Sequence, residues 1–254
     1  MNWDPELYAA YSDQRLRPAA DLIARIPLEA PARIVDLGCG AGAGARLLRA
    51  RWPHAEITGV DDSPEMLARA RAAMPEISWR EGDIAEWEPE APPDLLFSNA
   101  ALHWLDSHER LFPRLAGMLA KGGVLAVQMP DNFSAPSHRG VRKIAGYGSW
   151  APRFADLLER KPVAPLDHYV ALLEPLGEVA AWRATYPHRL EGEDSVFNWL
   201  SGATLRPFLS RLTAGEAKAF QDACRRELAR AYPMRGDGSV LFDFARIFII
   251  VQRS

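Results

Sequence analysis

The sequence predicts an α/β protein with a doubly wound, mostly parallel sheet, and two observations lead to this fold class. Short apolar segments alternate with helical patterns over residues 32–129, and strands that alternate with helices pair in parallel. After Pro130 the alternation stops, and two further apolar segments come late in the chain. We therefore expect five strands in the first half and two later ones, which together make a seven-stranded sheet.

Each expected strand is a short apolar run bounded by turn residues. The five early strands cover residues 34–37, 56–61, 77–81, 94–98 and 124–129, and the two late strands cover residues 178–190 and 244–252. Helical patterns separate them. Residues 45–51 end before a proline, Ser63-Pro64 opens a helix as N-cap and first-turn residue, and Asp106 is expected to cap another with Glu109 in its first turn.

The chain is expected to have three parts. Residues 1–30 form an aromatic-rich arm and a covering helix, and residues 31–130 form the ligand-binding core. Residues 131–254 hold the two late strands and a helical lid, because residues 131–176 are irregular and proline-rich and residues 193–232 are largely helical. A long irregular segment between strands is itself a sign of function.

The most informative stretch is a strand that ends in Asp36 and runs directly into Gly38-Cys39-Gly40. Glycine allows a sharp turn and a close approach of backbone to a nucleotide-like ligand. Asp36 can accept hydrogen bonds from loop amides or from a ligand ammonium group. The glycine pattern also fits a dinucleotide-binding turn if Ala43 replaces its last glycine, so this stretch alone leaves the cofactor open.

Acidic residues also end the second and third strands. Asp61 and Asp62 follow the glycine turn by roughly twenty residues, the spacing at which a carboxylate reaches ribose hydroxyls. Asp83 could accept from the exocyclic amine of an adenine, and Ile84 could lie against the ring. Met66 could rest on the adenine or belong to the core. Acids in this series favour a ligand with a cationic group.

The loop after the fourth strand and the N-terminal arm supply further candidates. Asn99 opens that loop, in which His103 could be a base or a capping residue and Trp104 a wall. The loop leaves the sheet where the strand order should reverse, which is where open α/β sheets bind ligands. Arg15 and Arg17, with the aromatic residues of the arm, could close over a ligand and pair with its carboxylate, or pack the arm onto the domain.

Composition sets the remaining limits. The 254 residues are 48% hydrophobic and 25% charged, as in ordinary globular proteins. The net charge of −3 argues against a nucleic-acid binder, although residues 1–130 are acidic and residues 131–254 mildly basic. Cys39 and Cys224 are far apart, and no signal peptide or apolar membrane span is recognisable. We expect a cytoplasmic protein that binds neither nucleic acid nor membrane and needs no metal.

Taken together, the motifs resemble those of the class I S-adenosylmethionine-dependent methyltransferases over about residues 30–130. They are Asp36-Leu37-Gly38-Cys39-Gly40, Gly59-Val60-Asp61, Gly82-Asp83-Ile84 and Ser98-Asn99-Ala100. The wider chain is similar to the trans-aconitate 2-methyltransferases in the stretches 3–8, 15–18, 102–105, 127–132, 205–207 and 246–249, and it departs from them over residues 134–165. The resemblance implies a Rossmann-like methyltransferase fold with a helical substrate lid.

The resemblance also implies a reaction, transfer of the sulfonium methyl group to a carboxylate of trans-aconitate, with S-adenosyl-L-homocysteine as second product. In this family the glycine loop carries the methionine portion, Asp61 the ribose, and Asp83 with Ile84 the adenine. Cofactor contacts are accordingly expected from Asp36, Gly38, Gly40, Asp61, Asp62, Met66, Asp83, Ile84, Asn99, Trp104 and Arg17.

A tricarboxylate substrate should be held by guanidinium groups, because their planar forks match carboxylates. Arg206 and Arg246 are the first candidates, with Arg183, Tyr232 and His103 after them. Three other functions stay open: a methyltransferase for another small acceptor, an NAD-dependent dehydrogenase, and a non-catalytic protein that binds the methyl donor.

Overall fold

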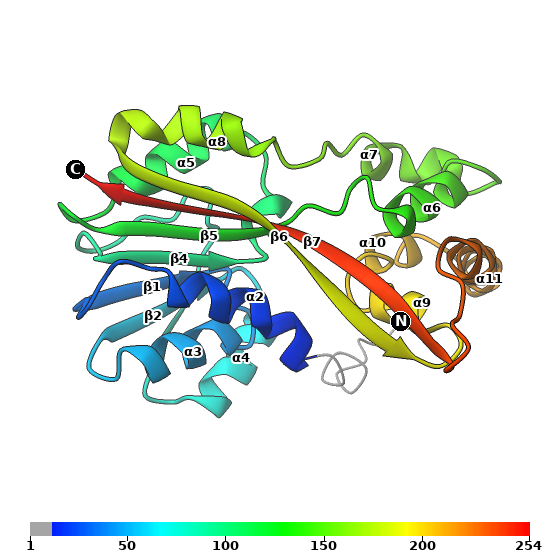
Figure 1. Cartoon of the computed structure of the whole chain (residues 1–254), viewed down its shortest axis with the longest axis horizontal. Helices are drawn as coiled ribbons and strands as arrows, with labels where there is room; N and C mark the ends of the chain where they lie inside the picture. The colour runs from blue at the N-terminus through cyan, green and yellow to red at the C-terminus, as the bar shows by residue number, and fades with distance from the viewer. Residues whose placement is uncertain (1–11) are drawn as a thin grey trace. The chain divides into compact units, whose positions relative to one another are not determined.

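A computed structural model describes residues 12–254, and its β-strands form one seven-stranded sheet in the order β3-β2-β1-β4-β5-β7-β6 (Figure 1). The strand order reverses between β1 and β4, as in a doubly wound sheet. The predicted α/β class is therefore confirmed, with seven strands in a mostly parallel sheet and helices beside it.

The five early strands pair in parallel. β1 lies between β2 and β4, and β3 and β5 pair with the outer sides of β2 and β4. Their bounds are Arg33–Leu37 (β1), Glu56–Asp61 (β2), Ser78–Glu81 (β3), Leu95–Asn99 (β4) and Val124–Pro130 (β5). The central strands β4 and β5 are buried along almost their whole length, which explains why they read as continuous apolar runs.

The two late strands are fifteen residues each, β6 at Gly177–Glu191 and β7 at Ser239–Arg253, and β7 is antiparallel to β5. The prediction for β6 is confirmed almost to the residue, whereas β7 begins five residues earlier than the predicted 244. The early part of β7 alternates between buried and exposed side chains, as at Val240, Leu241 and Phe242. An uninterrupted apolar run marks only the part of the strand that is buried on both faces.

The chain divides into two compact units. The larger comprises Arg15–Pro130, Ala164–Ala184 and Arg246–Ser254, and the smaller includes Asp131–Val163 and Thr185–Ala245. In the larger unit, α3 and α4 pack against β2, and α5 packs against β5 and α8 (Figure 1). The helices of this unit are most of α2 (Ser12–Ala24), which enters it at Arg15, and α3 (Ala43–Arg51), α4 (Pro64–Ala73), η1 (Leu102–Trp104), α5 (His108–Gly117), α8 (Leu166–Leu173) and η3 (Glu174–Leu176).

The predicted cap of α4 is confirmed. At α5 the predicted cap Asp106 is wrong, although Glu109 lies in the first turn as predicted. At α4, Ser63 is the N-cap, and its Oγ accepts from the Met66 N–H at 3.4 Å. At α5, the helix begins at His108, and the N-cap position is Ser107, in a left-handed conformation with φ 56° and no side-chain cap. His108 contacts Leu102 and Tyr169 through both ring nitrogens, so tertiary hydrogen bonds, and not Asp106, fix where α5 begins.

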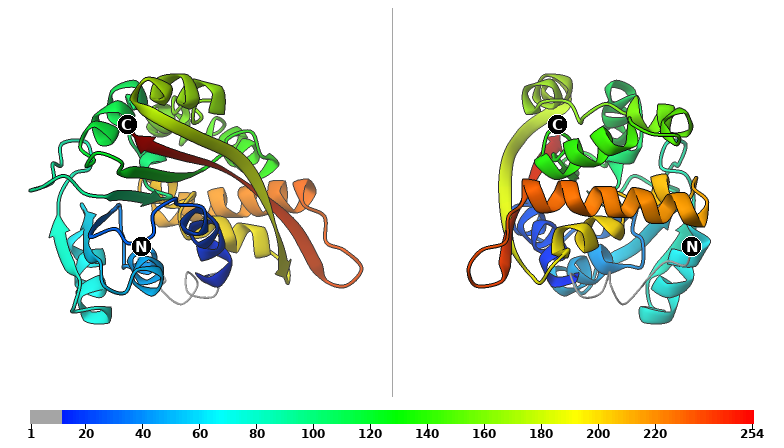
Figure 2. Two further views of the ribbon diagram at one scale, coloured as in Figure 1. Left: turned by 60° about the vertical axis from the view of Figure 1, so that its left-hand side comes forward. Right: turned by 90° about the vertical axis from the view of Figure 1, so that its right-hand side faces the viewer.

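The smaller unit is a helical layer with its own aromatic core. Its longest helix, α11 (Ala214–Ala231), packs against α6 and α9 (Figure 2). A capping box between Thr213 and Glu216 opens it. The rings of Phe154, Phe208 and Phe220 pack together in the core. The other helices are α6 (Pro136–Ala145), η2 (Ala151–Phe154), α7 (Ala155–Leu158), α9 (Ser195–Ser201) and α10 (Arg206–Leu209).

One helical glycine is required by packing, and a second provides a matched control. A Cβ at Gly44, the second residue of α3, would lie 2.7 Å from Asp36 Oδ2 and 3.1 Å from Phe97 Cε1. At Gly215, the second residue of α11, a Cβ would meet none of the described atoms within 4 Å outside its own helix backbone and chain neighbours.

We therefore expect Gly44→Ala to lower the melting temperature and Gly215→Ala to leave it unchanged or raise it. Alanine in a helix is favoured over glycine by up to ~1 kcal/mol, but contacts this short force backbone or side chains to move. Thermal unfolding followed by circular dichroism measures both variants. Equal shifts in the same direction would contradict the packing argument.

Candidate functional site

The turn after β1 is held by the backbone of β2. The amides of Gly38 and Cys39 both donate to the carbonyl of Val60, at 2.8 and 3.0 Å. Gly38 has φ 73°, and a Cβ there would lie 2.2 Å from the Cβ of Ala101. Only glycine fits at this position, because the loops that leave β1 and β4 come this close.

Asp61 ties this turn to the end of β2. Its Oδ2 accepts from the Gly40 N–H at 2.8 Å and its Oδ1 from the Ser63 N–H at 3.0 Å. Gly40 has φ 53°, and its Cβ position faces open space, with none of the described atoms within 4 Å. The carboxylate predicted to bind ribose thus also shapes the backbone against which a ligand would lie.

Asp36 is a buried acid at the end of β1. Its side chain is 2% exposed, and burial raises its pKa to about 7, aided by the negative charge of Asp61 and opposed by the Ala45 N–H. Its Oδ2 has no hydrogen-bond partner among the described residues. A buried carboxylate oxygen without a donor is unfavourable, so a cationic or hydrogen-bond-donating ligand would be stabilised beside it.

A cavity of about 340 Å³ lies at the ends of β2 and β3. Its lining residues are Asp62, Glu81, Gly82 and Asp83. Asp83 is exposed and its Oδ1 accepts from the Ala85 N–H at 2.8 Å. Cδ1 of Ile84 would lie 3.4 Å from a Cβ at Gly38. The structure therefore brings together Asp62 and Asp83, and it places Ile84 next to the glycine turn.

Met66 and Asn99 are two further cofactor candidates in the core. Met66 lies in the first turn of α4 and is half-buried. Asn99 ends β4, directly beside Gln128 of β5, and its Oδ1 is buried with no hydrogen-bond partner among the described residues. Asn99 thus presents an acceptor at the point where the strand order reverses.

The loop after β4 is anchored at both ends. Ser98 Oγ donates to the Leu37 carbonyl at 2.9 Å, and the Ala100 N–H donates to the Gln128 carbonyl at 2.9 Å. The loop then forms η1, which contains His103 and Trp104 with ring centroids 4.7 Å apart. The Trp104 side chain is 45% exposed, which suits a wall that a ligand would cover.

His108 positions η1, and the sequence analysis missed this role. Its Nε2 lies 2.9 Å from the Leu102 carbonyl and its Nδ1 2.7 Å from the Tyr169 hydroxyl. A carbonyl can only accept, so Nε2 carries the proton and Nδ1 accepts from Tyr169. Leu102 lies six residues earlier and Tyr169 is remote in the sequence, and a helix-start histidine gives no local signal of either contact.

The basic candidates differ in burial. Arg246 on β7 is only 6% exposed, and its Nη1 lies 3.5 Å from Gln128 Oε1. Arg183 on β6 and Arg206 at the start of α10 are exposed. Arg183, Arg246 and His103 belong to the larger unit, and Arg206 and Tyr232 to the smaller one.

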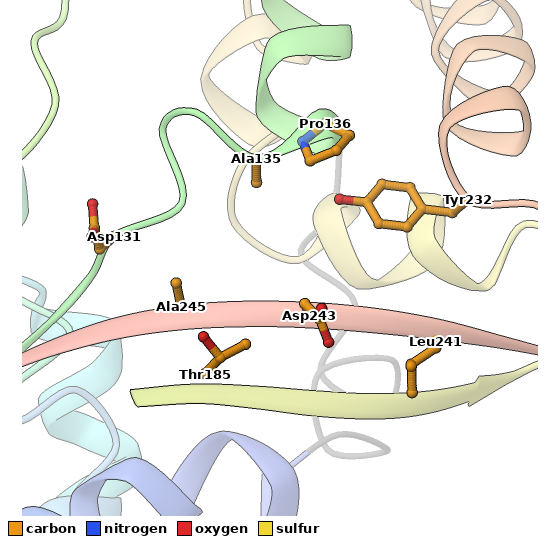
Figure 3. Close-up of a pocket in the computed structure, with 8 residues that line it drawn as sticks. All are labelled: Asp131, Ala135, Pro136, Thr185, Tyr232, Leu241, Asp243 and Ala245. Atoms are coloured by element: carbon orange, nitrogen blue, oxygen red, sulfur yellow. The ribbon is translucent and has the colours of Figure 1, made fainter. Parts of the chain in front are cut away.

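Tyr232 lines a cavity of about 350 Å³ within the smaller unit (Figure 3). Its hydroxyl accepts from the Ser137 N–H at 3.1 Å, and two carboxylates, Asp131 and Asp243, share the lining. These acids do not favour an anion at Tyr232. The lining residues are Asp131, Ala135, Pro136, Thr185, Tyr232, Leu241, Asp243 and Ala245.

The predictions for the N-terminal arm fall mainly outside the described residues. Residues 1–11, with their aromatic side chains, lie outside them, and so does the Arg15 side chain. Arg17 lies on α2 with an exposed side chain. Its place in a ligand site stays a prediction.

The two cysteines are buried and unpaired. Burial raises the pKa of the Cys39 thiol and raises that of Cys224 to about 12, so neither is suited to act as a nucleophile. Within residues 12–254, no group of three or more His, Cys, Asp or Glu side chains is arranged to hold a metal ion. None of the helices in that range combines the length and apolar character of a membrane span.

The strand order, the glycine turn and the acids at the strand ends define a methyltransferase domain, and a family model described as a methyltransferase domain matches residues 34–123. The chain is 48% identical to the trans-aconitate 2-methyltransferase of Methylobacterium nodulans, over all of this chain and 99% of that protein. It is 42% identical to the enzyme of that name from Escherichia coli, again over 100% and 99% of the two chains. The chain belongs to the trans-aconitate 2-methyltransferase family.

Solved structures of low sequence identity share the fold. The YcgJ protein of Bacillus subtilis is 16% identical, with a TM-score of 0.59 over 94% of this chain and 99% of that one. A Haemonchus contortus phosphoethanolamine N-methyltransferase solved with S-adenosyl-L-methionine is 18% identical, with a TM-score of 0.54 over 94% of this chain and 53% of that one. Both likenesses concern the fold alone.

The raised pKa of Asp36 predicts a specific pH dependence of stability. With a pKa of about 7 in the folded protein against 3.8 as the ordinary value, the folded state holds more protons than the unfolded state between these values. The free energy of unfolding should therefore fall as pH rises from about 4 to about 7. Asp36→Asn has no carboxyl group at this position, so it should not lose stability in this way as pH rises.

We expect the stability of Asp36→Asn relative to the unsubstituted protein to increase over that pH window by a few kcal/mol, since one pKa unit is worth about 1.4 kcal/mol. Urea denaturation of both proteins without ligand, in steps from about pH 4.5 to 8, measures the difference. Parallel stability profiles would show that Asp36 ionises in the fold as it does in water.

Proposed function

We propose that this protein transfers the methyl group of S-adenosyl-L-methionine to a carboxylate of trans-aconitate and releases the monomethyl ester and S-adenosyl-L-homocysteine. The observation that carries the proposal is the buried Asp36 carboxylate, whose Oδ2 has no hydrogen-bond partner among the residues that the structure describes and lies beside a glycine turn open at Gly40. The names of relatives at 42–48% identity over their full lengths support the choice of acceptor.

The residues at the strand ends fit the parts of this donor. Asp36 would hold the methionine ammonium group, Asp61 the ribose hydroxyls, and Asp83 with Ile84 the adenine. Asp62 and Met66 border the same region, and Asn99, Trp104 and Arg17 complete the proposed set. The acids along β1, β2 and β3 also stabilise the positive charge that the bound donor carries.

In this reaction the main task of the protein is to align the acceptor oxygen with the methyl group of the donor. The bound donor supplies an electrophilic methyl group, and a carboxylate is already ionised at neutral pH, so the acceptor needs no general base. The protein would orient the acceptor oxygen in line with the methyl group and exclude water. Hydrogen-bond donors should bind the non-reacting carboxylates, because donors on the reacting one stabilise a charge that disappears in the transition state.

Arg246 is the leading candidate for binding the acceptor. It is buried, and a charge-assisted, bidentate contact with a carboxylate is strongest where water is excluded. Arg206 and Arg183 are exposed, so contacts they make would be more screened. His103 and Tyr232 are retained as weaker candidates.

The function itself is tested by incubating the protein with the donor and trans-aconitate and analysing products by mass spectrometry. We expect a monomethyl ester and S-adenosyl-L-homocysteine in equal amounts. Ester formation from a different acid in a substrate panel would support another small acceptor. Donor binding without turnover of any acid would support a non-catalytic role.

Arg246→Ala should raise the KM for trans-aconitate by about ten- to a hundredfold, because charged hydrogen bonds of this kind are worth about 1.5–3 kcal/mol. The affinity for S-adenosyl-L-homocysteine, measured by calorimetry, should change little. Arg206→Ala is predicted to act in the same direction. Arg69→Ala, which removes an exposed partner of Glu65, is the control, and unchanged kinetics in both test variants would remove the anion-binding role.

Asp61→Ala should weaken donor binding by several-fold to about a hundredfold. It removes the proposed ribose contact and the acceptor of the Gly40 and Ser63 amides. Calorimetric titration measures the dissociation constant, with Asp222→Ala, which removes a partner of Lys218 on α11, as control. An unaltered dissociation constant in Asp61→Ala would refute the ribose assignment.

A further inference from the structure

Three polar side chains lie on the neighbouring strands β4, β5 and β7, near the edge of the sheet where the parallel strands end. Gln128 and Arg246 are buried, and Asn99 is half-buried with a buried Oδ1. Asn99 on β4 is the direct partner of Gln128 on β5. Gln128 is in turn opposite Phe248 on β7, so Arg246, two residues before Phe248, projects to the same face as Gln128. All of these residues belong to the larger unit.

The side-chain amide of Gln128 has a hydrogen-bonded oxygen and a nitrogen without a hydrogen-bond partner among the described residues. Its side chain is 0% exposed, its Oε1 accepts from Arg246 Nη1 at 3.5 Å, and its Nε2 has no hydrogen-bond partner among the described residues. A guanidinium has no acceptor, so the amide oxygen must face Arg246 and the NH₂ group must be the free end. Buried amide donors are nearly always paired, so this one indicates a ligand.

The polarity of the site changes along the strand order. Acceptors lie at the ends of β1, β2 and β4, namely Asp36, Asp61 and the Asn99 Oδ1, which has no hydrogen-bond partner within the described part of the chain. Donors lie on the next two strands, Gln128 on β5 and Arg246 on β7. A cationic ligand is stabilised over the first group and an anionic one over the second.

We propose that Gln128 Nε2 and the Arg246 guanidinium together bind one non-reacting carboxylate of the acceptor, and that Gln128 is a specificity residue for the number of carboxylates. This inference rests on the function proposed above. The amide adds a third donor direction beside the guanidinium fork, so a carboxylate bound there is fixed in orientation as well as in position. Gln128 holds Arg246 in the same arrangement through its Oε1.

Two variants of Gln128 test the contact. Gln128→Ala removes the donor, and Gln128→Glu keeps the shape but replaces the donor by a carboxylate that would pair with Arg246 and repel an anion. Gln252→Ala is the matched control, because Gln252 lies on the same sheet at the opposite end of β5, paired with Val124, and its Nε2 donates to the Gly122 carbonyl.

The measurement uses trans-aconitate and three dicarboxylates, mesaconate, glutaconate and itaconate, each of which lacks a different one of its carboxylates. A compound that is not methylated is measured by its inhibition constant. For trans-aconitate we expect Gln128→Ala to raise KM about ten- to a hundredfold with little change in kcat, and Gln128→Glu to raise it further. The S-adenosyl-L-homocysteine affinity of both variants and the kinetics of Gln252→Ala should stay unchanged.

The decisive comparison is between compounds. One of the three dicarboxylates lacks the carboxylate that Gln128 binds, and for this compound Gln128→Ala and the unsubstituted protein should have the same KM or inhibition constant. For the other two dicarboxylates, Gln128→Ala should still raise that constant. The inference would be overturned if Gln128→Ala raised the KM or inhibition constant equally for all three dicarboxylates, or if KM were unchanged in both Gln128 variants. Failure of the unsubstituted protein to methylate or bind trans-aconitate would instead overturn the proposed function, and it is visible before any variant is made.

Discussion

The binding edge of the sheet is built around one carboxyl group, Asp36, whose ionised form is destabilised by burial. Asp36 ends β1 at the centre of the sheet, is almost fully buried, and has its pKa raised to about 7 by that burial. The surrounding backbone is adapted to it: Gly44 leaves the space that Oδ2 occupies, and Gly38 lets the β4 loop approach. Groups whose pKa is perturbed by burial are concentrated at functional sites, and this supports the proposal that the donor binds at the Asp36 edge of the sheet.

Much of the fold could be predicted because its signals are local. Buried strands, the glycine turn, the Ser63 cap and the late strand at Gly177–Glu191 each depend on a short stretch of sequence. The prediction failed where distant residues decide. At the start of α5, His108 donates to the Leu102 carbonyl and accepts from the Tyr169 hydroxyl, which lies far along the chain. The first part of β7 is half exposed, so that its apolar pattern is interrupted.

The same distinction applies to the site. Asp36 and Asp61 lie at the carboxyl ends of β1 and β2, and Asp83 lies two residues after β3, so the sequence could place them at one edge of the sheet. It could not separate the arginines, because burial of Arg246 and exposure of Arg206 are properties of the packed structure. Gln128 was missed, although one signal existed: it is the single polar residue in a strand that is otherwise apolar.

The position of Cys39 within the glycine turn has a consequence for oxidative conditions. The thiol is buried, and its pKa is raised by that burial and by the nearby Asp36 and Asp61 carboxylates. Disulfide exchange, alkylation and oxidation to sulfenic acid all begin with a thiolate. The acids proposed to stabilise the donor's positive charge therefore also disfavour the Cys39 thiolate, and this lowers the reactivity of the sulfur toward oxidants.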